Sequence, residues 1–230
     1  MTQTNRLLAL LALGAPSAAD ADALQQQVLT AAKQVSARDF AFTQTTRMQR
    51  TGTQARDIVQ RYDPRRGAAA WSLLKIDGRA PTAKESAASA KNAAKAQVAS
   101  YARISEWFGA PATRIATTPT SVTYRFAKLP KGAIKMGSHD ASANTSVDAV
   151  VNTAGRIPFV ERARFTSTTA FRMMMVVKVD RFIFATTNRL LADGRPVPES
   201  VITEFGGSFM GKAQTMTTQT RYSDVQSARP

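Results

Sequence analysis

The glycine-rich stretch at residues 206–213 comes nearest to a known chemical motif. It reads GGSFMGKA and has the G-x-x-x-x-G-K spacing of a phosphate-binding loop. However, Ala213 stands where that loop needs a Ser or Thr to bind magnesium, and strand-like Thr-rich sequence follows where a helix is required. We therefore interpret the stretch as a glycine-rich bend or bulge in a sheet and predict no nucleotide site there.

His139 is the single histidine of the chain, and it stands beside Asp140 in a polar segment. A Ser-His-Asp hydrolase could be assembled from such residues, but no G-x-S-x-G nucleophile elbow accompanies them. A solvated loop histidine is the simpler interpretation, and the hydrolase is kept as a third hypothesis. One histidine and no cysteine argue against zinc, and no two carboxylates have a spacing that suggests acid/base work. We predict a non-enzymatic protein with no catalytic residue, metal or cofactor.

The chain is strongly basic, with 31 Lys+Arg against 16 Asp+Glu and a formal charge of +15. Such a charge favours anionic partners, including acidic lipid head groups and polyanions, although a generally basic proteome would give the same balance. Arg61, Arg65 and Arg66 form a cluster without a recognition helix or an RNA-binding aromatic motif, so nucleic acid is not expected. We interpret the three arginines as a solvated rim, with binding of anionic head groups as the alternative.

The first residues resemble a secretory signal. Arg6 precedes an apolar run over residues 7–13, and Ala-x-Ala patterns follow at residues 19–21 and 21–23. The run is too short to cross a bilayer, and an amphipathic helix start is the alternative interpretation. We predict a signal peptide over residues 1–23 and export to the periplasm as a soluble, non-membrane-spanning protein. Without cysteine there is no lipidated N-terminus.

Hydrophobic periodicity predicts an α+β protein. Residues 22–38 have helical spacing, residues 39–50 and 57–62 alternate like strands, and a further strand surrounds Trp71. Thr82-Ala83-Lys84-Glu85 is a capping box, and the periodic residues after it predict one long helical insertion over residues 82–108. From residue 115 onward, short strands separated by turn pairs predict a strongly curved antiparallel sheet, all within a single domain over residues 24–230.

Alternation also predicts which side chains share one face of this sheet. Met173, Met174 and Met175 stand between Phe171 and Val177, and methionines suit irregular apolar surfaces. The simpler interpretation is that these methionines fill the core. The alternative is that they line a site for a flexible apolar ligand. The residues that we predict to line such a cavity are Phe40, Phe42, Trp71, Leu73, Met173, Met175 and Val177.

One short segment resembles a known family. Phe40-Ala41-Phe42-Thr43-Gln44-Thr45, after a signal peptide and a helix, is similar to the first strand of LolA in the LolA/LolB superfamily of bacterial envelope proteins. The resemblance implies an unclosed β-barrel whose concave face is covered by helices, with acyl chains bound between them. Val59-Gln60-Arg61-Tyr62 resembles the V-K-R-P segment of LolA, which implies a lid-closing role for Arg61. Here Tyr62 and Asp63 intervene before Pro64, and LolB's lipidated cysteine is missing.

Two functional hypotheses rank ahead of the hydrolase. The first is a periplasmic carrier that holds a lipid or acyl chain, possibly that of a lipoprotein, between a curved sheet and helices, with an anionic head group at a basic rim. The second is a basic cell-envelope module with a filled core, which docks on a polyanion or on an envelope protein. The ligand, the transport partners and the oligomeric state do not follow from the sequence.

Overall fold

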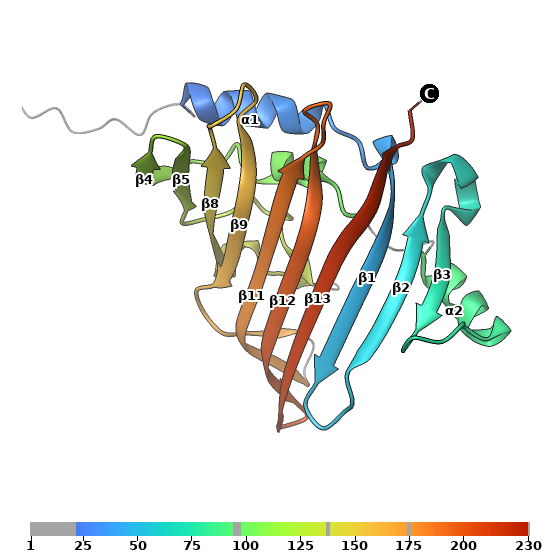
Figure 1. Ribbon diagram of the computed structural model, residues 1–230. Coiled ribbons are helices and arrows are strands. Elements are labelled where there is room, and N and C mark those ends of the chain that lie inside the picture. Colours follow the sequence, from blue (N-terminus) through green and yellow to red (C-terminus); the bar gives the residue numbers. More distant parts are fainter. Residues whose placement is uncertain (1–21, 94–97, 137–138, 174–175, 230) are drawn as a thin grey trace, which may run out of the picture.

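The computed structural model describes residues 22–93, 98–136, 139–173 and 176–229 (Figure 1). Residues 1–21 of the predicted signal peptide lie outside this description. The helical elements are α1 (Ala23–Lys33), η1 (Ala37–Asp39), η2 (Pro64–Ala69), α2 (Ala83–Ala93), η3 (Tyr101–Glu106) and η4 (Ser142–Asn144), where η marks a 3-10 helix. The strands are β1 (Phe40–Arg50), β2 (Arg56–Tyr62), β3 (Trp71–Ile76), β4 (Thr113–Thr118), β5 (Ser121–Phe126), β6 (Lys135–Met136), β7 (His139–Asp140), β8 (Thr145–Asn152), β9 (Phe159–Ser167), β10 (Phe171–Met173), β11 (Val177–Leu190), β12 (Pro196–Phe209) and β13 (Lys212–Ser227).

One 11-stranded sheet dominates the fold. Its order is β3-β2-β1-β13-β12-β11-β9-β8-β5-β4. The short strand β10 is not part of this order and pairs with β11. Neighbouring strands are antiparallel, and β3 and β4 form two unpaired edges, so the sheet is open. The antiparallel sheet predicted from the strand pattern is confirmed, and the sheet is unclosed, as the resemblance to LolA implies. Strand β1 pairs with β13, which brings the two ends of the domain together.

Alternation along each strand separates two faces of the sheet. Gln44 lies opposite Gln60 and Tyr222 in the register, whereas its neighbour Thr43 lies opposite Arg61. We call the first side the inner face. It also carries the in-register row Phe126, Val147, Phe165 and Phe184, which runs across β5, β8, β9 and β11. We call the other side the outer face.

The hydrophobic core lies on the inner face, under α1 and η3. The Trp107 ring packs edge to face on Phe126 and Phe165, with centroids 5.2 and 5.1 Å apart. Val28 and Ala32 of α1 are fully buried, and α1 lies across one end of the sheet (Figure 1). Asp22 caps α1 by accepting from the Gln25 N–H at 3.0 Å. The Gln25 side-chain amide donates to the Phe108 and Ala110 carbonyls, which ties α1 to the segment that follows η3.

The prediction of one helix over residues 82–108 is wrong. The capping box is present, since the Glu85 N–H donates to the Thr82 hydroxyl at 3.3 Å and the Glu85 carboxylate accepts from the Thr82 N–H at 2.8 Å. However, α2 ends at Ala93, residues 98–100 are not helical, and η3 is a separate 3-10 helix. The Ser100 hydroxyl accepts from the Ala102 N–H at 3.2 Å and thereby caps η3.

Different packing partners account for this division. The Ala-, Ser- and Lys-rich first part has a thin apolar stripe and packs mainly against β3, at the sheet edge. Tyr101, Ile104, Trp107 and Phe108 are all buried in the core instead. Helix periodicity in the sequence is continuous across both parts, but the burial of the aromatic cluster determines where the second part must lie.

The glycine-rich stretch forms a β-hairpin, as the bend interpretation requires. Strand β12 continues to Phe209, and β13 begins at Lys212. Met210 and Gly211 both have positive φ angles, 49° and 79°, which are typical of a two-residue hairpin turn. Gly207 lies so close to the backbone carbonyl of Lys178 that a Cβ atom would clash with it. The glycine therefore permits close pairing of β11 and β12, and no phosphate-binding loop is formed.

Candidate functional site

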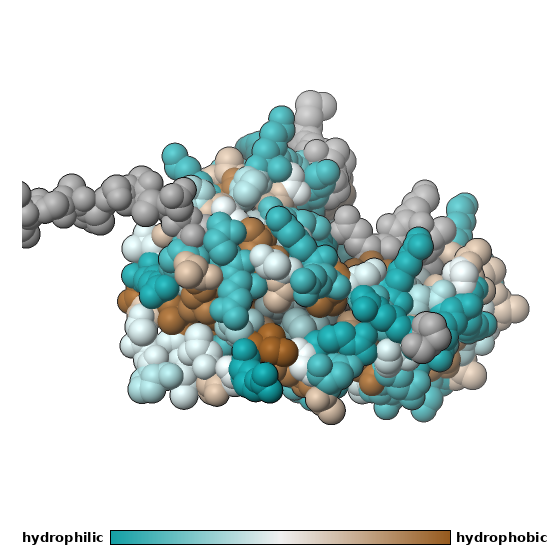
Figure 2. Space-filling view, turned by 90° about the horizontal axis from the view of Figure 1, so that it is seen from above, coloured by the Kyte–Doolittle hydropathy of each residue, from teal (hydrophilic) through white to brown (hydrophobic). Residues whose placement is uncertain are grey.

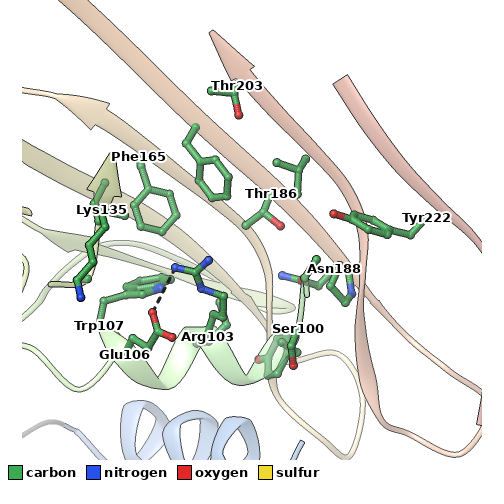
Figure 3. A pocket seen from close by; sticks show the side chains of 18 of the residues that line it. Ser100, Arg103, Glu106, Trp107, Lys135, Phe165, Thr186, Asn188, Thr203 and Tyr222 are labelled. Carbon is green, nitrogen blue, oxygen red and sulfur yellow. Dashed lines mark hydrogen bonds and ion pairs between the residues drawn. The ribbon is translucent and has the colours of Figure 1, made fainter. Parts of the chain in front are cut away.

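A cavity of about 480 Å³ lies between η3 and the inner face (Figure 3). We call it the principal cavity. The segment around η3 supplies one side, β6 and the residues before it supply a second, and β9, β11, β12, β13 and β1 supply the floor. The residues that line it are Gln44, Ala99, Ser100, Tyr101, Arg103, Ile104, Glu106, Trp107, Ala133, Ile134, Lys135, Met136, Phe165, Phe182, Phe184, Thr186, Asn188, Pro198, Val201, Thr203 and Tyr222.

The deep wall of the principal cavity is aromatic and aliphatic. Phe165 stacks edge to face with Phe184 at 5.2 Å and with Trp107 on its other side. Phe182 and Ile104 are almost completely buried beside them. These rings are held by strand register and by the core, so the wall is pre-formed before a ligand binds.

Two buried polar side chains of this cavity, Asn188 and Tyr101, are satisfied within the protein. Asn188 donates to the Val160 carbonyl at 2.9 Å, and the Tyr101 hydroxyl accepts from the Val160 N–H at 2.8 Å. Burial raises the pKa of Tyr101 far above its usual range and that of Tyr222 to about 12. Both phenols are therefore neutral at physiological pH. The interior provides an uncharged environment, which suits an apolar chain.

The charged side chains of the lining are exposed to solvent. Arg103 and Glu106 are each nearly half exposed and pair at 3.4 Å between Nη2 and Oε2. Lys135, in β6, is exposed on another side of the cavity. Figure 3 shows these three residues with Trp107 and Phe165 around the same space. Charge is thus confined to the accessible part of the cavity, where water can solvate it.

A second cavity of about 500 Å³ lies between α2 and the β1-β2-β3 end of the inner face. Ile58, Trp71, Leu73 and Ile76 form its apolar side, and the Gln60 amide donates to the Ser89 hydroxyl of α2 at 3.2 Å. Gln44 lines both cavities. The inner face therefore offers two hollows that meet at one side chain of β1.

The predicted lining residues are distributed over three places. Phe40 and Phe42 are both 5% exposed and line a small apolar hollow of about 10 Å³, together with Tyr222. Trp71 and Leu73 line the second cavity. Met173 and Val177 pair with each other in the β10–β11 hairpin and are not among the lining of the cavities. Met175 lies outside the described residues.

Sequence reasoning missed the residues that define the principal cavity. Phe182 and Phe184 stand in the part of the chain for which short strands are predicted, and Trp107 stands near the end of the predicted 82–108 helix. These residues are far apart in the sequence and far from β1, so the sequence does not show that they line the same cavity. The available signal was the density of aromatic residues at 107–108 and 182–184.

The three arginines predicted at the rim do not line the cavities that the structure describes. Arg61 lies on the outer face, where it donates to the Asp224 carbonyl at 3.1 Å and to the Thr43 hydroxyl at 3.4 Å. Arg65 pairs with Asp63 at 2.8 Å, and Arg66 donates to the Ser72 hydroxyl. A lid-closing role for Arg61 remains a prediction from the family resemblance.

The histidine is not a freely solvated loop residue. Its ring stacks on Phe171, with centroids 4.6 Å apart and planes 9° apart, and its Nε2 is buried without a partner among the described residues. Asp140 does not accept from His139 there; its carboxylate accepts from the Ser142 and Gly132 N–H groups. A triad of His139 with Asp140 is therefore not assembled. Within the described ranges, no three acidic or histidine side chains gather as a metal site.

Comparisons with known proteins give a likeness at the level of structure. No family model matches the sequence, and no curated protein matches it. The chain is similar to the crystal structure of a LolA superfamily protein from Nitrosomonas europaea. The two are 10% identical with a TM-score of 0.40, over 92% of this chain and 94% of the other. Residues 40–45 resemble the same superfamily. Across the described residues, no helix has the length and apolar character needed to span a bilayer.

Proposed function

We propose that the protein is a non-enzymatic carrier that holds the acyl chain of a lipid or lipoprotein in the principal cavity. The observation that carries the proposal is an open-sheet cavity with an aromatic wall, an uncharged interior and charges only on exposed side chains. Its volume of about 480 Å³ lies in the range of about 300–1,000 Å³ found for small-molecule sites. Each methylene group transferred into it contributes about 0.8 kcal/mol.

The orientation of the ligand follows from the same separation of charge. The chain enters among Trp107, Phe165 and Phe184, and an anionic head group remains near Lys135 and Arg103. Because Arg103 is paired with Glu106, we assign the main contact with the anionic head group to Lys135. No covalent step is required, because binding depends on burial of apolar surface.

Export to the periplasm is part of this proposal, and the α1 cap suggests where processing occurs. Asp22 accepts from the Tyr124 hydroxyl at 2.8 Å and from Arg114 at 2.7 Å. Cleavage after Ala23 would remove this cap, whereas cleavage after Ala21, at the first Ala-x-Ala pattern, would retain it. We expect a mature protein that begins at Asp22. Intact-mass measurement of protein secreted from its full-length precursor tests this, and a first residue of Leu24 would contradict it.

Native mass spectrometry after mild purification tests the carrier function. We expect a mass increment that corresponds to a lipid or fatty acid, and re-uptake of added acyl ligand after delipidation. A clean protein mass that resists added lipid at several concentrations contradicts the proposal.

The second candidate, an envelope module that docks on a polyanion, is supported by the outer face. Arg47, Arg162, Arg164 and Arg221 are exposed there. Arg47 has a weak contact to Asp57 at 3.6 Å. Salt-sensitive binding of heparin without any lipid uptake would favour this candidate over the carrier. Lipid uptake that is insensitive to an excess of heparin would favour the carrier.

A further inference from the structure

Three apolar side chains are exposed together at one end of the sheet. Val176 is 43%, Phe209 51% and Met210 70% exposed. The Met210 N–H donates to the Val176 carbonyl at 2.9 Å, and Val177 lies opposite Phe209 in the register. We call Val176, Phe209 and Met210 the hairpin tip. In Figure 1 it lies where β12 and β13 join, at the end of the sheet away from α1.

Other exposed apolar residues are isolated from one another. They lie on four separate elements: Leu74 on β3, Ile115 on β4, Ile157 in the β8–β9 connection and Ile202 on β12. At the α1 end, apolar surface occurs in small patches between hydrophilic residues (Figure 2). Scattered side chains of this kind are normal in soluble proteins, whereas a contiguous apolar group marks a surface that contacts something.

Cations lie on the strands that adjoin the hairpin tip. Lys212 lies directly opposite Phe209, and Arg172 lies opposite Lys178 on the adjoining pair of strands. Lys178 is neutralised by Asp180 at 2.6 Å. Arg172 and Lys212 have no ion-pair partner within the described part of the chain. The tip thus combines an apolar point with an excess of positive charge.

The tip is continuous with the apolar inner face. Met173, Val177 and Phe209 form one cross-strand row, and Phe171, Val179 and Gly207 form the next. Phe171 and Val179 belong to the same hydrophobic cluster as Phe182, which lines the principal cavity. An apolar strip therefore leads from the end of the sheet to the cavity.

We propose that the hairpin tip inserts into the surface of an anionic phospholipid bilayer. Apolar side chains at such a surface enter the boundary between head groups and acyl chains, while neighbouring Lys and Arg meet the phosphates. Three side chains on a narrow hairpin cover far less than the roughly 1,200 Å² of a stable protein interface, so a protein partner is a poorer fit. The proposal holds whether or not the principal cavity carries a ligand.

Vesicle co-sedimentation of the full chain tests the insertion. We expect binding to vesicles that contain phosphatidylglycerol and little binding to pure phosphatidylcholine. Met210→Ser should weaken binding several-fold, and Phe209→Ser with Met210→Ser about tenfold or more. Ile115→Ser, at a side chain 42% exposed on β4, is the matched control and should bind like wild type. Equal binding by wild type and the double variant, or no binding by wild type, overturns the proposal.

A spectroscopic readout separates insertion from surface adsorption. Met210→Trp should show a blue shift on addition of anionic vesicles and quenching by brominated acyl chains, and Ile115→Trp should show neither. Lys212→Gln should weaken binding to anionic vesicles and reduce its dependence on salt. Unchanged tryptophan emission from the vesicle-bound Met210→Trp variant overturns the proposal. A second outcome also overturns it: wild type fails to bind vesicles but forms a dimer, and Phe209→Ser dissociates that dimer.

Discussion

The indole of Trp107 meets the ring of Phe165 edge to face, with centroids 5.1 Å apart and planes at 78°. One ring comes from the segment after η3 and the other from β9. The pair joins the helical segment to the inner face at the back of the principal cavity. Both residues line that cavity, so the contact that stabilises the domain also shapes the binding wall.

Trp107→Ala should strongly destabilise the protein. The side chain is 4% exposed and contacts three aromatic rings, and removal of a buried Trp typically costs about 3–5 kcal/mol. Urea unfolding followed by circular dichroism measures the change in the free energy of unfolding. Ile115→Ala, on an exposed edge strand, should stay within about 0.5 kcal/mol of wild type. A loss below about 1 kcal/mol for Trp107→Ala would show that η3 does not anchor the core.

Tyr101→Phe tests a single buried hydrogen bond. The Tyr101 hydroxyl accepts the Val160 N–H at 2.8 Å, and the variant leaves that buried donor without a partner. We expect a loss of about 1–3 kcal/mol. Tyr222→Phe is the matched control, because the Tyr222 hydroxyl makes no hydrogen bond to any residue that the structure describes. Equal effects of the two changes in urea unfolding would contradict this account.

The cap of α1 predicts a loss of stability in acid. Burial alone would raise the pKa of Asp22, but hydrogen bonds from Arg114, the Gln25 N–H and Tyr124 outweigh it and lower the pKa to about 2. An unfolded aspartate titrates near about 3.9. The lowered pKa therefore adds stability above about pH 4, and this contribution is lost as the pH falls from about 4 to about 2.

Asp22→Asn measures that contribution because asparagine retains the cap and removes the charge. The variant should be less stable than wild type at about pH 7, and the difference should shrink as the pH approaches about 2. Glu85 and Asp63, whose pKa values are also lowered to about 2 by Arg79 and Arg65, are present in both proteins and cancel in the comparison. Asp148→Asn, in an exposed ion pair with Arg125, should change stability little at any pH. A pH-independent difference for Asp22→Asn would contradict the linkage.

The sequence predicts local structure well where a physical signal is local. Alternation correctly predicts the burial of Phe40 and Phe42, and the Thr82–Glu85 capping box correctly predicts the start of α2. Alternation also separates Arg61 from Tyr62, and the structure places Arg61 on the outer face. The rim interpretation came from the clustering of Arg61 with Arg65 and Arg66, and the lid-closing role came from the family resemblance; neither signal specifies the face on which Arg61 lies.

The principal cavity depends on long-range arrangement, which no local pattern specifies. Its floor requires β1 to pair with β13, from the other end of the domain. Its opposite wall requires the chain to leave the helical state between α2 and η3. Tyr101 and Trp107 are drawn into the core there, because burial of their rings outweighs continued helix propensity. Strand order and this break therefore became known only from the structure.

The most direct test of the carrier function is acyl-ligand affinity in a pair of neighbouring Trp variants. Thr203→Trp fills the principal cavity from β12, whereas Ile202→Trp adds the same side chain to the outer face of the same strand. Displacement of a fluorescent fatty-acid probe gives the affinities, and thermal melts verify folding. We predict at least about tenfold weaker binding for Thr203→Trp and an unchanged affinity for Ile202→Trp. Equal affinities in two folded variants, or no binding by wild type, would contradict binding in this cavity.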